Sequence, residues 1–140
     1  MPVPAFSAFT AASELFVTAG VLYIIRRNWT RRRFALWLFL AVALFEAFVN
    51  VMYMASRASQ VAGSSGPPLA AGMKLAYASH GLLSLLAYLV FVMFGVFAWQ
   101  EQKNGRFLFR DRPALTFAFL VVWVVSVLSG EGIFVARYLL

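Results

Sequence analysis

The residues best suited to chemistry are four ionisable side chains that lie within long apolar stretches of the chain. The sequence has five acidic residues and one histidine, and the four that fall in such stretches are Glu14, Glu46, His80 and Glu131. A charged group at the centre of a bilayer costs about 3 kcal/mol on insertion scales, so such groups usually face protein and mark function. They are the first candidates for a binding site.

These groups lie at a similar depth, measured from the same side of the membrane. At 1.5 Å of helical rise per residue, Glu14 and Glu46 come out about 13 and 15 Å from the ends of their stretches. The same geometry gives about 10 Å for His80, about 8–10 Å for Glu131 and about 9 Å for Asn50. A shared layer predicts one protein-lined site formed by these five residues.

Helical spacing adds a supporting polar shell. Glu46 and Asn50 lie one turn apart, and His80 belongs to a second polar stripe with a spacing of three and four residues, so each set occupies one helix face. Structural hydrogen bonding between helices, and aromatic residues at the membrane interface, are alternative interpretations of the same stripes. The supporting residues predicted in this way are Tyr53, Tyr77 and Ser84.

Several ligands suit this set of side chains. Carboxylate oxygens and an imidazole nitrogen are ligands for zinc, iron, manganese or copper. One histidine excludes a bis-histidine haem within the chain, but His80 can supply a single axial ligand. Since histidine titrates near neutral pH, a His–Glu pair can also accept protons from a quinol. Metal, haem and quinone therefore remain open, and no catalytic residue is predicted because no nucleophile–base arrangement is present.

Four apolar segments position these groups. Each exceeds the roughly 20 residues that a helix needs to cross a bilayer, and none alternates as a membrane β-strand does. The whole sequence is 63% hydrophobic and 12% charged, whereas soluble domains have about 25% charged residues. The prediction is one all-α integral membrane domain over residues 1–140, with four transmembrane helices in an antiparallel up-down bundle. The predicted helices are 5–25, 34–56, 75–99 and 113–136.

The basic residues predict the orientation of the bundle. Nine of the twelve fall in the connections that follow the first and third segments, and the positive-inside rule places such connections in the cytoplasm. Both termini are then outside, in a multi-pass protein of the inner (cytoplasmic) membrane. The nine residues are Arg26, Arg27, Arg31, Arg32, Arg33, Lys103, Arg106, Arg110 and Arg112.

The remaining connection and the composition limit the kinds of partner and of bound group that we expect for this chain. Residues 58–72 contain Ser64-Ser65-Gly66-Pro67-Pro68, which predicts a flexible outer loop. Two separate basic blocks do not form the single basic face of a nucleic-acid-binding protein, so we expect lipid and membrane subunits as partners and no nucleic acid. The lack of cysteine excludes disulfides and thiolate metal sites.

Three stretches resemble one known group of membrane proteins. They are the basic hairpin from Ile25-Arg26-Arg27 to Arg33-Phe34-Ala35-Leu36, the sequence Tyr77-Ala78-Ser79-His80, and Arg110-Asp111-Arg112 followed by Trp123-Val124-Val125-Ser126-Val127. In these the chain resembles the YozB/CtaM-like four-helix family, which is associated with assembly of haem–copper oxidases. The family pattern carries further histidines where this chain has arginine, so only His80 carries over as a family ligand.

The resemblance implies a function. It suggests a small accessory or assembly protein of the respiratory membrane, and the residues themselves add a site in which the glutamates and His80 bind metal, haem or quinone. Two alternatives come from the residues themselves. One is a proton- or cation-coupled carrier that uses the intramembrane glutamates, and the other is a structural subunit of a larger membrane complex.

Overall fold

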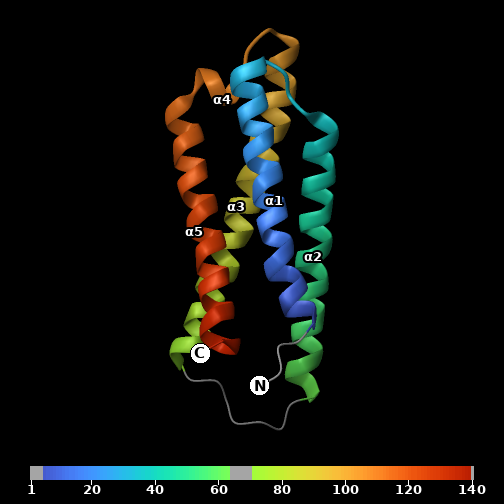
Figure 1. Cartoon of the computed structure of the whole chain (residues 1–140), viewed down its shortest axis with the longest axis vertical. Helices are drawn as coiled ribbons and strands as arrows, with labels where there is room; N and C mark the ends of the chain where they lie inside the picture. Colours follow the sequence, from blue (N-terminus) through green and yellow to red (C-terminus); the bar gives the residue numbers. More distant parts are fainter. Residues whose placement is uncertain (1–4, 64–70, 140) are drawn as a thin grey trace.

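The regular structure is entirely helical in the residues that the computed structural model describes, 5–63 and 71–139. The elements are α1 (Ala5–Arg31), α2 (Leu36–Gly63), α3 (Ala71–Lys103), α4 (Leu108–Asp111) and α5 (Pro113–Tyr138). Four of them, α1, α2, α3 and α5, are long and apolar enough to cross a membrane (Figure 1). The predicted all-α class and the four membrane-length helices are confirmed.

The long helices extend beyond their predicted bounds. α1 continues to Arg31 and ends where Arg32 adopts a left-handed φ of 52°, a common way for a helix to stop. α2 and α3 also run farther, so the predicted 58–72 connection shrinks to residues 64–70, and its Ser-Gly-Pro stretch lies outside the described residues. Apolar length predicts only the part of a helix inside the bilayer, because polar residues can prolong the backbone hydrogen bonding beyond it.

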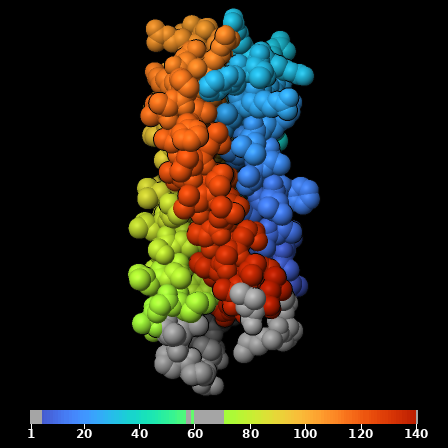
Figure 2. All heavy atoms as spheres, turned by 60° about the vertical axis from the view of Figure 1, so that its left-hand side comes forward, coloured from blue at the N-terminus to red at the C-terminus, as the bar shows by residue number. Residues whose placement is uncertain are grey.

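The four long helices form a closed ring. α1 packs against α2 and α5, and α3 packs against the same two helices. In the described residues, the diagonal pairs α1–α3 and α2–α5 make no close backbone approach. Figure 2 shows α5 lying between α3 and α1 on one face of the molecule. Each helix therefore has two neighbours and contributes one side to a shared interior.

Aromatic rings fill the interior toward the end of the bundle that carries α4. Phe91 of α3 lies 5.2 Å from Phe39 of α2 and 5.6 Å from Trp123 of α5 between ring centroids. Phe119 continues the cluster 5.8 Å from Trp123. All four side chains are buried. We call these residues the aromatic cluster.

Large apolar side chains also cover the outside of the ring. Phe16, Trp37 and Phe117 are 79%, 82% and 70% exposed, and they lie on different helices. A water-soluble domain rarely exposes continuous apolar surface. The outward faces are those of a bundle surrounded by lipid.

The short helix α4 closes one end of the bundle. Its Leu108 and Phe109 are 3% and 1% exposed. The Phe109 main-chain nitrogen donates to Asn28 Oδ1 at 3.3 Å, and Thr116 Oγ1 donates to the Phe109 carbonyl at 2.9 Å. α4 is therefore tied to both α1 and α5.

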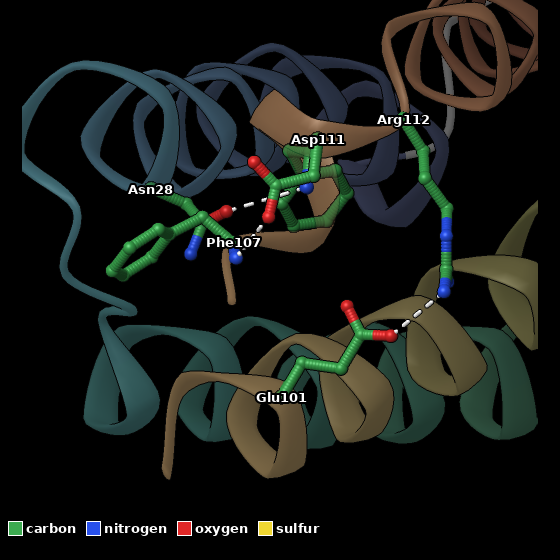
Figure 3. Close-up of polar contacts among 6 residues, drawn as sticks. Asn28, Glu101, Phe107, Asp111 and Arg112 are labelled. Carbon is green, nitrogen blue, oxygen red and sulfur yellow. Dashed lines mark hydrogen bonds and ion pairs between the residues drawn. The ribbon is translucent and has the colours of Figure 1, made fainter. Parts of the chain in front are cut away.

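Two further contacts brace the connection that carries α4. Figure 3 shows Asp111 turned toward the Phe107 nitrogen, which donates to Oδ2 at 2.8 Å. Arg112 reaches Glu101 at the end of α3, with 3.0 Å between Nη2 and Oε1. The predicted basic connection after α3 is thus an ordered cap over residues 104–112, held by specific contacts.

Candidate functional site

Glu14 and Glu46 form a carboxyl pair between α1 and α2. The two side chains line the same small cavity and lie close enough to interact, and Glu46 is only 6% exposed. Asn50 Nδ2 donates to Glu46 Oε2 at 3.0 Å and to the Glu46 carbonyl at 2.9 Å. A carboxylate can only accept hydrogen bonds, so a bond between two carboxyl groups requires a proton on one of them.

The tight connection between α1 and α2 explains how this pair forms. Glu14 lies about 26 Å along α1 from the helix end at Arg31, and Glu46 about 15 Å along α2 from its start at Leu36. The four non-helical residues 32–35 between the helices span up to about 13 Å when extended, at ~3.3 Å each. An extended connection is long enough to cover the difference between these two distances. It therefore brings the two carboxyl groups to the same level along the bundle axis.

A small cavity lies beside the carboxyl pair. Its volume is about 10 Å³, close to the ~10–15 Å³ that one water molecule needs. All four long helices contribute to its wall, which combines carboxyl, amide and hydroxyl groups with apolar side chains. The lining residues are Glu14, Glu46, Asn50, Ser84, Ala87, Tyr88, Trp123, Ser126 and Val127.

His80 belongs to a separate contact between α3 and α5. Its Nδ1 lies 2.8 Å from Ser129 Oγ, and the Ser129 hydroxyl donates to the Ser126 carbonyl at 2.7 Å. Because a hydroxyl has a single hydrogen, Nδ1 of His80 carries the proton that is donated to Ser129. The ring also lies against Gly130, where an added methyl carbon would come within 2.8 Å of His80 Cε1.

The other predicted residues lie away from the cavity wall. Glu131 is partly exposed and close enough to Glu14 for an electrostatic interaction. The Tyr77 hydroxyl accepts from Arg137 Nη1 at 2.5 Å, and the guanidinium also lies over the tyrosine ring. Tyr53 is partly buried and does not line the cavity.

The structure thus gathers part of the predicted site. Glu14, Glu46, Asn50 and Ser84 meet at one cavity, whereas His80, Glu131, Tyr53 and Tyr77 do not line it. Five lining residues were not among the predicted site residues, and two of these, Tyr88 and Ser126, carry hydroxyl groups. Tyr88 continues the Ser84 stripe one turn further, which is a signal that finds it, but Ser126 lies in an apolar run without one.

The donor set limits what the cavity can hold. Within residues 5–63 and 71–139, no three histidine, aspartate or glutamate side chains come together as a metal-binding group. A cavity the size of one water molecule has no room for a haem or a quinone ring. What fits is a proton on the Glu14–Glu46 pair, or a small cation with at most one water.

Each side of the helix ring also carries at least one polar link between helices. Such links contribute on average about 0.6 kcal/mol each in membranes. They are the Glu14–Glu46 pair between α1 and α2, Tyr88 Oη to the Ala43 carbonyl at 3.1 Å between α3 and α2, His80 to Ser129 between α3 and α5, and Trp123 Nε1 to Thr18 Oγ1 at 3.1 Å between α5 and α1.

Comparisons with protein-family models, with curated proteins and with solved structures returned no match to this chain. The candidate site is therefore defined by its geometry in this chain.

Proposed function

We propose that the chain is a multi-pass protein of the inner (cytoplasmic) membrane, with helices that run antiparallel in turn and with both termini outside. The arginine-rich ends of the helices support this orientation, because basic connections stay in the cytoplasm. The start of α1 and the end of α5 lie at the opposite end of the bundle from α4 (Figure 1). The cytoplasmic end is then the one that α4 caps.

Single-cysteine labelling tests this orientation, because the natural chain contains no cysteine. Ser59 and Asn104 are exposed; Ser59 lies near the end of α2, and Asn104 directly follows α3, at the end of the bundle that carries α4. A membrane-impermeant maleimide is expected to label Ser59→Cys on intact cells, and Asn104→Cys only after the membrane is permeabilised. The reverse pattern would place the arginine-rich end outside, and labelling of both variants on intact cells would contradict the spanning topology.

For the function itself, we propose a small accessory or assembly protein of the respiratory membrane whose Glu14–Glu46 pair binds a small cation, with the proton as the simplest ligand. The observation that carries the proposal is the contact between the two carboxyl groups at the wall of a water-sized cavity. The respiratory setting is supported by the resemblance of residues 77–80 and 123–127 to the oxidase-assembly family.

The position of the aromatic cluster indicates which side exchanges the cation. Phe39, Phe91 and Phe119 are buried, and each lies closer along its helix to the α4 end than the cavity-lining residues of that helix do. Rings packed in this way offer no polar groups to a proton or a hydrated ion. The pair therefore exchanges with the outer aqueous phase, on the side where α1 begins and α2 ends.

A proton- or cation-coupled carrier is the second candidate, because a carboxyl pair shared by two helices is sensitive to their relative movement. Transport requires alternate access from both sides, so the aromatic cluster would have to separate. Cation flux in liposomes that depends on Glu46 would favour the carrier over the accessory protein.

Infrared spectroscopy of protein with ¹³C-labelled glutamate tests the proposed site. At neutral pH we expect a carbonyl band of a protonated glutamic acid in the natural protein. Glu46→Gln and Glu14→Gln should each abolish or shift that band, because each removes one partner of the shared proton. Glu101→Gln is the matched control, since Glu101 pairs with Arg112 and takes no part in the cavity.

Two results would overturn the proposed site. One is the absence of a protonated-carboxyl band in the natural protein together with unchanged spectra in both variants. The other is purification with a haem absorption band or stoichiometric metal that disappears in His80→Ala, which would assign the ligand to His80 instead.

A further inference from the structure

A second cavity lies on the opposite half of α1, along the face that ends at the arginine-rich connection. Its volume is about 180 Å³, and it is lined by Tyr23, Arg26, Arg27, Thr30 and Arg31. The spacing of these residues places them on one helix face. Residues 23–31 lie at the same end of the molecule as the 104–112 connection (Figures 1 and 2). We call this cavity the arginine groove.

The arginine groove has positive charges without protein partners. The ion pair found among residues 5–63 and 71–139 joins Arg112 to Glu101. Within these residues, Arg26, Arg27 and Arg31 therefore have no acidic partner. Arg27 Nε is buried and has no hydrogen-bond acceptor. Buried donors are nearly always paired, so this nitrogen indicates an acceptor that comes from outside the chain.

The chemistry of the lining indicates what that acceptor is. A guanidinium presents its N–H groups as a planar fork that matches two oxygens of a phosphate or carboxylate. The Thr30 hydroxyl donates to the Arg26 carbonyl at 2.8 Å, so donation to a ligand falls to the arginines. Tyr23 is 48% exposed and lies at the end of the groove nearest the bilayer centre. Tyrosine is enriched at the level of lipid headgroups.

We infer that the arginine groove binds the phosphate of an anionic membrane lipid. Arg26 and Arg27 follow directly after the last apolar residues of the first span, Ile24 and Ile25. A phosphodiester at that depth belongs to a lipid headgroup, and basic pockets on the cytoplasmic side of membrane helices bind acidic headgroups in this way. Inorganic phosphate has the same oxygens, but it has no reason to concentrate at the interface.

Native mass spectrometry of the detergent-solubilised protein tests this inference. Phosphatidylglycerol should be retained in preference to phosphatidylcholine. Arg27→Gln should weaken its binding about fivefold, the equivalent of ~1 kcal/mol for one arginine near the membrane surface. Arg31→Gln, at an exposed position, is a second variant with the same expected direction. Arg106→Gln is the matched control, because Arg106 is exposed and lies outside the groove.

Three outcomes would overturn the inference. Equal retention of the two lipids would show that the groove does not select an anionic headgroup. Equal weakening by Arg27→Gln and Arg106→Gln would show that binding reflects total charge rather than this groove. Displacement of the lipid by an equal concentration of inorganic phosphate would assign the groove to a soluble anion.

Discussion

Replacing Gly95 by alanine is expected to destabilise the bundle strongly. A methyl carbon at this position would lie 2.0 Å from Phe39 Cε2 and 2.3 Å from Cζ, whereas carbon atoms in contact normally lie about 3.5–4.0 Å apart. Phe39 has little room to move, because its ring centroid lies 5.5 Å from that of Phe34 and 5.2 Å from that of Phe91. We expect a loss of about 3 kcal/mol in the free energy of unfolding, at the upper end of typical overpacking effects.

Unfolding of the purified protein in mixed micelles by increasing dodecyl sulfate measures this loss. Gly81→Ala is the matched control on the same helix, since nothing lies within 4 Å of its added methyl carbon. That substitution should be neutral or stabilise the helix by up to ~1 kcal/mol. The double variant Gly95→Ala/Phe39→Leu should recover part of the stability. Equal stability of Gly95→Ala and Gly81→Ala would contradict the close packing of α2 on α3.

Replacing Phe109 by alanine is the second change with a large expected effect. Phe109 is 1% exposed, and its main chain is tied to Asn28 on one side and Thr116 on the other. The segment cannot collapse into the space that the ring leaves, so a cavity should persist. Removal of a buried phenylalanine in this way costs about 3–5 kcal/mol.

The same unfolding measurement applies, with hydrogen exchange at residues 107–112 as a local readout. Exchange there should accelerate as α4 detaches, because local opening follows the loss of buried contacts. Phe117→Ala is the control: Phe117 is 70% exposed on the outer face of α5, so its loss should change stability by less than about 0.5 kcal/mol. Similar effects of the two substitutions would contradict the role of α4 as a packed cap.

The helices were predictable because apolar length is a direct consequence of bilayer thickness. The ends were not, since residues such as Asn28 look like loop residues in the sequence but are buried in the structure. Asn28 accepts a hydrogen bond from Phe109, 81 residues later in the chain. A four-residue element such as α4 has no periodicity to reveal it, and only the packing of Leu108 and Phe109 defines it.

The depth of the site residues along their helices was predictable from the sequence, but the direction in which each side chain points was not. Counting residues placed Glu14 and Glu46 at a similar depth, because rise per residue is nearly constant, and in the structure both line one cavity. Which neighbour a side chain faces depends on helix rotation and packing, and these depend on small residues elsewhere. Gly130 illustrates this, since its missing side chain makes the space that the His80 ring occupies beside Ser129.

The polar links around the helix ring have a consequence for movement along the bundle axis. Every long helix takes part in links to both of its neighbours. A helix that slid by one turn, about 5.4 Å, would break bonds on two sides at once and leave their donors and acceptors facing hydrocarbon. Piston-like sliding is therefore opposed at every helix, and small tilts that preserve the vertical alignment are the motions left to this protein.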